Sequence, residues 1–490
     1  MSTEPGGKAS GPGGGASDGA SDGINGGSAG AAASRSVLGR GSIYTLGTAA
    51  PILANAAVVP VVTRLLGKPA YGVVAIAIVV IQVAMMAGSL GMPSVITRQG
   101  ILARSGVAGA RALVVRGSLM TGGLIAVIIL SAPLWDRVLQ VPLRNAVLMA
   151  LAASAFFVVV ENCQALLRVL DRPGAFVSLS LTATLGGPLL GLALLAGDRS
   201  PERYLIGLMA GYAAAAAVGL VLCLRGGRPG RERGDTRAAL RIGLPVIPHL
   251  VSLFLANGAL VFLAEQLFDL ADAGRIQLAL LVGSSPAVIT SALNNSWAPI
   301  VYRAPEHERG AVLAHTARDI TALSALISGG VALLSPWLMQ FVAGAAFAPV
   351  DLVPAVAIVA FGCVVSVAYL ANVHLVFAAG RSLGLSLVTP LSLAVGLAIA
   401  YLAGREHLVL LAVGFPSTYV ALAVGTAWLR RHVGAVGWSE MTLLGPVGLG
   451  LGLCALGAAL PTSGAAALVR VAVAAAAGFG TLRLARRALG

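Results

Sequence analysis

The chain has 490 residues, of which 57% are apolar, 11% charged and 5% aromatic, and its mean hydropathy is +0.90. A soluble protein carries charge on about 25% of its residues, so a cytosolic enzyme, a secreted disulfide scaffold and a disordered protein are all excluded. Apolar stretches near 20 residues recur, each long enough to cross about 30 Å of hydrocarbon as a helix. The composition therefore predicts an all-α polytopic membrane protein.

In chain order, residues 1–36 are rich in Gly, Ala and Ser and predict a disordered cytoplasmic tail. Apolar runs then predict about fourteen transmembrane helices, separated midway by a basic break from Arg225 to Arg241. The predicted spans are 42–63, 72–92, 112–132, 146–168, 176–197, 203–224, 243–264, 276–298, 316–343, 353–378, 384–403, 408–429, 441–460 and 465–484.

The distribution of positive charge predicts the topology. With the N-terminus in the cytoplasm and spans alternating, 24 of the 33 Lys and Arg residues fall on the cytoplasmic side and 9 on the outer side. Such an excess is typical of cytoplasmic loops in multi-pass proteins. Most of the formal charge of +14 therefore reports topology rather than nucleic-acid binding, and both termini are expected in the cytoplasm.

The second half of the chain resembles the first. At an offset of 202 residues Gly72 falls on Gly274, and Arg116 falls on Arg318. An offset spanning six helices predicts two six-helix bundles related by a pseudo-two-fold axis along the membrane normal, with a site between them. The expected divisions are listed here: an N-terminal six-helix bundle at 37–224, a basic cytoplasmic linker at 225–242, a C-terminal six-helix bundle at 243–430, and two extra transmembrane helices at 431–490.

One stretch resembles a known family. The segment VVPVVTRLLGKPAYGVVAIAIVV at 58–80, followed by GSLGMPSVITRQG at 88–100, is similar to the opening of bacterial lipid-linked polysaccharide flippases. These belong to the multidrug/oligosaccharidyl-lipid/polysaccharide exporter superfamily. The resemblance implies a V-shaped pair of bundles that moves polyprenyl-diphosphate-linked oligosaccharide from the inner to the outer leaflet by alternating access. It also implies a bacterial plasma (inner) membrane protein in which the last two helices help form a lipid groove.

Polar side chains inside spans are costly in hydrocarbon and are candidates for function. Glu161, Gln164, Arg168 and Arg172 follow an i, i+3, i+7, i+11 spacing and share one helical face. Arginine suits a diphosphate because its planar fork holds two oxygens. The candidate substrate-binding residues are Arg64, Arg98, Asn55, Arg168, Gln164, Asn257, Asn295 and Asn372. Glu161 and Glu265 are candidate carboxylates for proton or sodium coupling.

Several alternatives stay open. A multidrug or cation antiporter of the same superfamily would centre on acidic residues, and a lipid II flippase would differ only in cargo. A membrane enzyme would need a long outer loop with catalytic groups, so no enzymatic activity, catalytic residue, metal site or cofactor is expected. The expected partners are the lipid-linked oligosaccharide, membrane lipids and glycan polymerase or glycosyltransferase enzymes, and no nucleic acid. The glycan and the coupling ion stay undetermined.

Overall fold

The computed structural model describes residues 57–102, 105–139, 143–225, 227, 229, 234–379 and 382–489. Within these residues the chain consists of helices joined by turns and short irregular segments, without a β-strand. The all-α class predicted from composition is therefore confirmed. The predicted tail at 1–36 and most of the first predicted span, 42–63, lie outside the described residues.

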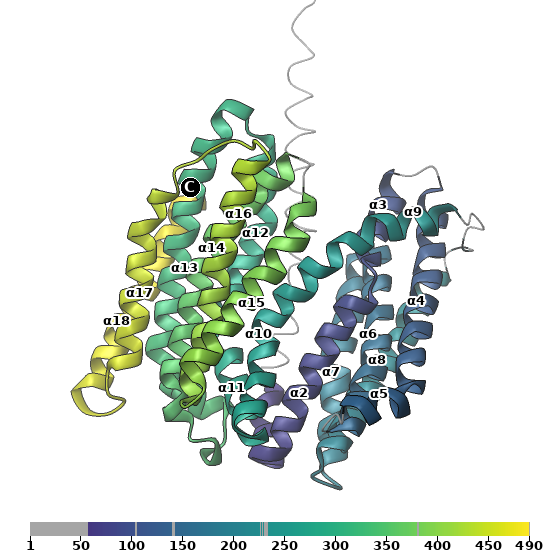
Figure 1. Cartoon of the computed structure of the whole chain (residues 1–490), viewed down its shortest axis with the longest axis horizontal. Coiled ribbons are helices and arrows are strands. Elements are labelled where there is room, and N and C mark those ends of the chain that lie inside the picture. The colour runs from purple at the N-terminus through teal and green to yellow at the C-terminus, as the bar shows by residue number, and fades with distance from the viewer. Residues whose placement is uncertain are drawn as a thin grey trace, which may run out of the picture.

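The helices form two groups that lie close together at one end and diverge toward the other (Figure 1). The first group starts with a short apolar helix, Ala57–Leu66. Its other members are α2 (Lys68–Gly88), α3 (Met92–Leu102), α4 (Gly106–Leu130), α5 (Ala132–Leu139), α6 (Arg144–Val169), α7 (Pro173–Leu195) and α8 (Pro201–Leu224).

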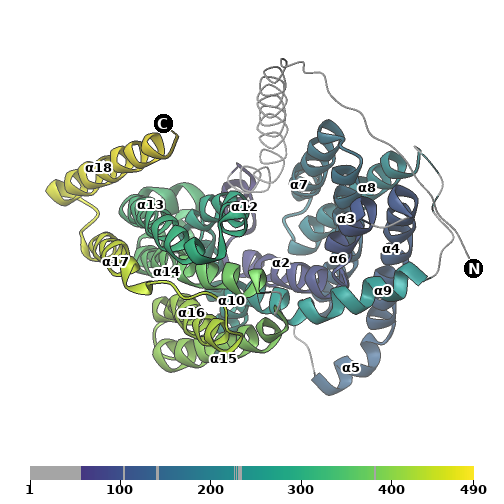
Figure 2. The same cartoon turned by 90° about the horizontal axis from the view of Figure 1, so that it is seen from above.

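The second group follows α9 (Gly234–Gly243), which continues through one 3-10 turn into α10 (Ile247–Leu267). Figure 2 shows α17 and α18 at the edge of this group, on the side away from the first. Its further helices are α11 (Leu270–Gly283), α12 (Pro286–Arg303), α13 (Glu306–Val342), α14 (Val353–Ala378), α15 (Leu385–Gly404), α16 (Gly414–His432), α17 (Leu444–Ala459) and α18 (Gly464–Leu489).

Twelve helices in the described part of the chain are long and apolar enough to cross a membrane. They correspond to twelve of the fourteen predicted spans. The predicted span 276–298 is divided between α11 and α12, because the helix is interrupted at Ser284 and Ser285, just before Pro286. Proline at the start of a helix lacks the N–H that a continuous helix needs there. The predicted basic linker, 225–242, contains α9, whose Ala239 is buried in the core of the first group.

Small residues determine how closely α7 and α8 pack. Gly187 and Gly191 on α7 face Gly207 and Gly211 on α8, each pair spaced by four residues. A Cβ at Gly207 would overlap the backbone of Gly191, and a Cβ at Gly211 would overlap that of Gly187. Lipid tails are as apolar as the side chains, so the hydrophobic effect does not drive helices together in a bilayer. Helices associate there through close van der Waals contact instead. This motif holds the two backbones in direct contact.

The two groups meet along α2. Gly72 packs against the backbone carbonyl of Leu270 at the start of α11. One turn further along α11, Gly274 also packs on Gly72. Midway along α2, Val79 contacts Gly258 of α10. One hydrophobic core joins both groups across this boundary. The groups are therefore connected at the end where α2 and α11 begin, while α9 links them at the other end (Figure 1).

Candidate functional site

The polar face predicted from sequence is present on α6 for Glu161, Gln164 and Arg168, but not for Arg172. The left-handed backbone at Asp171 follows the end of α6, and Arg172 is the N-cap residue of α7. Glu161 and Gln164 are partly buried, and Arg168 is exposed near the C-terminal end of α6. The Arg168 guanidinium lies 5.6 Å from the centre of the Phe176 ring, a cation–π contact that orients it. A carboxylate, a carboxamide and a cation thus follow one another along one face of α6.

Arg98 lies on α3, a helix that contacts α6. It is exposed on α3, two residues before Gly100, whose backbone packs directly on Val169 at the end of α6. Arg98 and Arg168 therefore occupy neighbouring helix ends. Within the described residues neither guanidinium forms an ion pair with a carboxylate. Arg168 interacts electrostatically with Glu161, two turns earlier on α6. Two exposed cations at one end of the first group can still attract an anion.

Arg64 has other partners. Its guanidinium donates to the carbonyls of Gln340 at 3.3 Å and Phe341 at 3.0 Å, and the hydroxyl of Thr63 donates to Val342 at 2.9 Å. These are the last carbonyls of α13, which have no acceptor role inside the helix. Arg64 and Thr63 therefore cap α13 and join the first helix to the second group. Headgroup contact by Arg64 stays a prediction.

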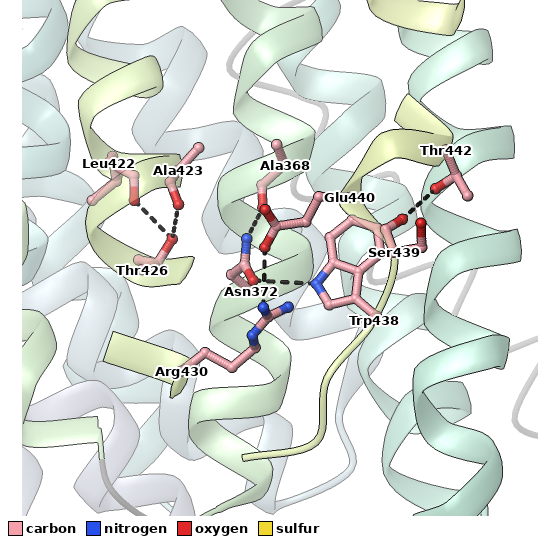
Figure 3. Close-up of polar contacts among 10 residues, drawn as sticks. All are labelled: Ala368, Asn372, Leu422, Ala423, Thr426, Arg430, Trp438, Ser439, Glu440 and Thr442. Carbon is pink, nitrogen blue, oxygen red and sulfur yellow. Dashed lines mark hydrogen bonds and ion pairs between the residues drawn. The ribbon is translucent and has the colours of Figure 1, made fainter. Parts of the chain in front are cut away.

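Asn372 belongs to a cluster at the junction of α14, α16 and the segment that leads into α17 (Figure 3). Its amide nitrogen donates to Ala368, and its oxygen accepts a hydrogen bond of 3.2 Å from the indole of Trp438. Arg430 and Glu440 form an ion pair of 3.2 Å in the same cluster. The Asn372 oxygen therefore holds the 433–443 segment, while its nitrogen bonds within α14. One N–H and one oxygen lone pair stay available for a ligand.

The remaining predicted residues are dispersed. Asn257 lies on α10 with a buried amide oxygen that has no hydrogen-bond partner in the described part of the chain. Glu265, near the end of α10, accepts a hydrogen bond from Gln266 at 2.6 Å. Asn295 lies on α12, and Asn55 falls outside the described residues. The structure places Arg98 on a helix that contacts the end of α6 but does not bring all predicted ligands to one place.

A large groove lies on the surface of the second group. The residues that line it were not predicted from the sequence. It measures about 1070 Å³ and is lined by α14, α15, α16 and α17. Its walls are aliphatic, with Trp428 at one end and Cys454 on the α17 side. A groove of this character accepts hydrocarbon chains rather than a polar headgroup. In the sequence, only the two additional C-terminal helices indicated a groove. Leucines that line a groove cannot be distinguished by sequence from leucines that face lipid.

Solved structures with the same architecture are membrane transporters. An inward-facing MATE family multidrug resistance transporter of the MOP superfamily matches with a TM-score of 0.59 and 17% identity, over 79% of this chain and 94% of that one. The lipid II flippase MurJ, in an inward closed conformation, matches with a TM-score of 0.63 and 12% identity, over 91% of this chain and 99% of that one. A MATE transporter from Vibrio cholerae matches at 0.55 and 14%, over 80% and 97%.

The fold and its twelve apolar helices therefore define a multi-pass membrane protein whose architecture is similar to that of these transporters. Residues 61–352 match the profile of a family described as polysaccharide biosynthesis protein, and this match covers more than half of the chain. The chain belongs to that family, which confirms the superfamily predicted from the motif at 58–100. A search of the curated proteins gives no significant match.

Proposed function

We propose that this protein moves a polyprenyl-diphosphate-linked oligosaccharide from the inner to the outer leaflet of a bacterial plasma membrane by alternating access. The observation that carries the proposal is the pair of exposed cations on α3 and at the end of α6, Arg98 and Arg168, neither of which forms a salt bridge with a carboxylate among the described residues. A diphosphate needs unneutralised cations, and arginine binds phosphate oxygens through charge-assisted hydrogen bonds.

The membership in a polysaccharide biosynthesis family supports a glycan as the cargo. With the N-terminus in the cytoplasm, Arg98 and Arg168 lie at the cytoplasmic end, where a newly made lipid-linked glycan is located. The diverging ends of the two groups lie on that same side (Figure 1). The prenyl chain stays in the bilayer during transport, and the apolar groove beside α17 gives lipid chains a surface on the protein.

A cation-coupled multidrug antiporter is the second candidate, and Glu161 favours it. This carboxylate is partly buried within α6, a helix long and apolar enough to cross a membrane, and ionisable groups inside such helices mark ion pathways in many transporters. The fold likeness to MATE transporters is compatible with this candidate. A lipid II flippase is compatible with the likeness to MurJ, and differs from the first proposal in cargo alone.

The test is to measure lipid-linked glycans by leaflet in a strain that lacks the protein. We expect an undecaprenyl- or decaprenyl-diphosphate oligosaccharide to accumulate on the inner leaflet. The wild type should relieve this, and an Arg98→Ala, Arg168→Ala double variant should not. Arg203→Ala is the matched control, because Arg203 is an exposed arginine paired with Asp198. Unchanged glycans, with drug sensitivity that depends on Glu161, would overturn the proposal in favour of the antiporter.

A further inference from the structure

A second cavity lies among the helices of the first group, and Phe254 of the second group also lines it. It measures about 330 Å³ and receives side chains from α2, α6, α7, α8 and α10. Four of its lining residues are aromatic and two more carry an amide or a hydroxyl. These six are Gln82, Phe157, Thr184, Tyr204, Tyr212 and Phe254. The cavity is therefore different in kind from the aliphatic groove beside α17.

The aromatic walls are held rigidly. The rings of Phe157 and Tyr212 meet edge to face, with centroids 4.9 Å apart and planes at 71°. The ring of Tyr204 lies against Gly191 of the small-residue contact between α7 and α8, where a Cβ would come within 2.6 Å of it. Because Tyr204 and Tyr212 are eight residues apart on α8, both project from one face of that helix.

Polar groups in the cavity are left without protein partners. The amide of Gln82 and the hydroxyls of Tyr204 and Tyr212 make no hydrogen bond within the described part of the chain. A buried tyrosine hydroxyl usually finds a partner, and an unpaired polar group in an apolar setting costs free energy. Three such groups facing one cavity are suited to a ligand that carries many hydroxyls and also has apolar C–H faces.

The cavity is connected to the cation site through α6. Phe157, Glu161, Gln164 and Arg168 follow an i, i+4, i+7, i+11 spacing, so one polar face runs from the aromatic wall to the helix end. Eleven residues of helix rise about 16 Å. This separation is several times the size of one sugar ring, and matches a short oligosaccharide that extends from a diphosphate held at Arg168.

We propose that this cavity binds a sugar ring of the transported glycan, a few rings away from the diphosphate. The proposal rests on the proposed function. Pyranose rings present C–H faces that pack on Phe157 and Tyr212, and hydroxyls that bond to Gln82 and the tyrosine hydroxyls. Phe254 comes from α10, in the second group, so one wall moves away when the two groups rearrange. The cavity therefore binds the sugar in one arrangement and releases it in another.

The probes for the test are the lipid-linked oligosaccharide purified from the deletion strain and undecaprenyl diphosphate, which lacks sugar. Binding of each to purified full-length protein is measured separately. We expect the wild type to bind the glycosylated carrier more tightly. Tyr212→Phe and Gln82→Ala each remove hydrogen-bonding groups, and each should reduce that preference roughly threefold to tenfold. Affinity for undecaprenyl diphosphate should not change, which also shows that the variants are folded.

Phe415 and Tyr419 on α16 provide the matched control. Their rings also meet edge to face, with centroids 5.0 Å apart and planes at 67°, in the second group. Tyr419→Phe and Phe415→Leu should leave the sugar preference unchanged, while Phe157→Leu should lower it. A preference that survives in the cavity variants, or a wild type that binds both probes equally, would overturn the cavity assignment. Failure of the wild type to bind either probe would instead overturn the proposed function.

Discussion

Replacing Arg470 should detach α18 from the rest of the molecule. Arg470 is completely buried on α18. Its guanidinium donates to carbonyls of Pro461 at 3.1 Å, Leu333 at 2.9 Å and Gly457 at 2.7 Å, and also to Leu460. The acceptors belong to the end of α17, the turn after it and α13. Only 11% of the apolar window of α18 is buried inside the protein, so this one side chain supplies most of the specific attachment.

The magnitude follows from the four hydrogen bonds. At about 0.6 kcal/mol each, a typical value inside membranes, they stabilise the attachment by roughly 2.4 kcal/mol. At about 1.5 kcal/mol each, the lower value for bonds to a charged group, the total is roughly 6 kcal/mol. Arg470→Leu should therefore increase the open population of α18 at least about fiftyfold. Arg470→Lys keeps the charge but has three donors on one nitrogen, so it should give an intermediate effect.

Hydrogen–deuterium exchange of the protein in lipid nanodiscs measures this opening. We expect faster exchange in Arg470→Leu for the turn at 460–463 and the start of α18, with α2 and α6 unchanged. An Arg470→Leu protein that exchanges like the wild type would show that lipid and apolar contacts hold α18, and the reasoning would fail. Equal effects of leucine and lysine would show that the number of hydrogen bonds does not determine the attachment.

Two further predictions concern stability. Gly207→Val should prevent α7 and α8 from packing, because the valine side chain would overlap the facing helix. We expect loss of folded protein on size-exclusion chromatography. The Gly122→Val variant should elute as the wild type, because no atom lies within 4 Å of a Cβ added at Gly122. Trp438→Phe removes the donor to the Asn372 oxygen and should lower the free energy of unfolding by about 1 kcal/mol, seen as a lower Tm; an unchanged Tm would show that the indole ring, rather than its N–H, holds the segment.

The sequence predicted the helices well and their ends less well, for a physical reason. Hydropathy detects the apolar length that a bilayer requires, but backbone geometry determines where each helix begins and breaks. The predicted span 72–92 is α2 at Lys68–Gly88, because Pro69 favours the first turn of a helix and the left-handed backbone at Leu90 and Gly91 ends it. Similarly, Ala239 and Leu240 give α9 a buried face within a run of arginines that predicted only a linker.

The site was predicted in part. Helical periodicity placed Glu161, Gln164 and Arg168 on one face correctly, because that inference needs only the repeat of one helix. The aromatic cavity could not be found in this way, since Gln82 comes from α2 while Tyr204 and Tyr212 come from α8, and the periodicity of one helix does not show how it packs on another. A tyrosine at a helical position is ordinary core by itself. Only the packing shows that its hydroxyl faces a space.

The repeat in the sequence explains the contact between the two groups. The offset of 202 residues pairs Gly72 with Gly274, and the structure places these two glycines against each other. Residues related by a two-fold axis meet only where the axis passes between them, as in a symmetric dimer interface. The pseudo-two-fold axis predicted from the repeat would therefore pass close to Gly72 and Gly274. A Cβ at Gly72 would overlap the Leu270 carbonyl, so the close contact of α2 with α11 at this point requires glycine.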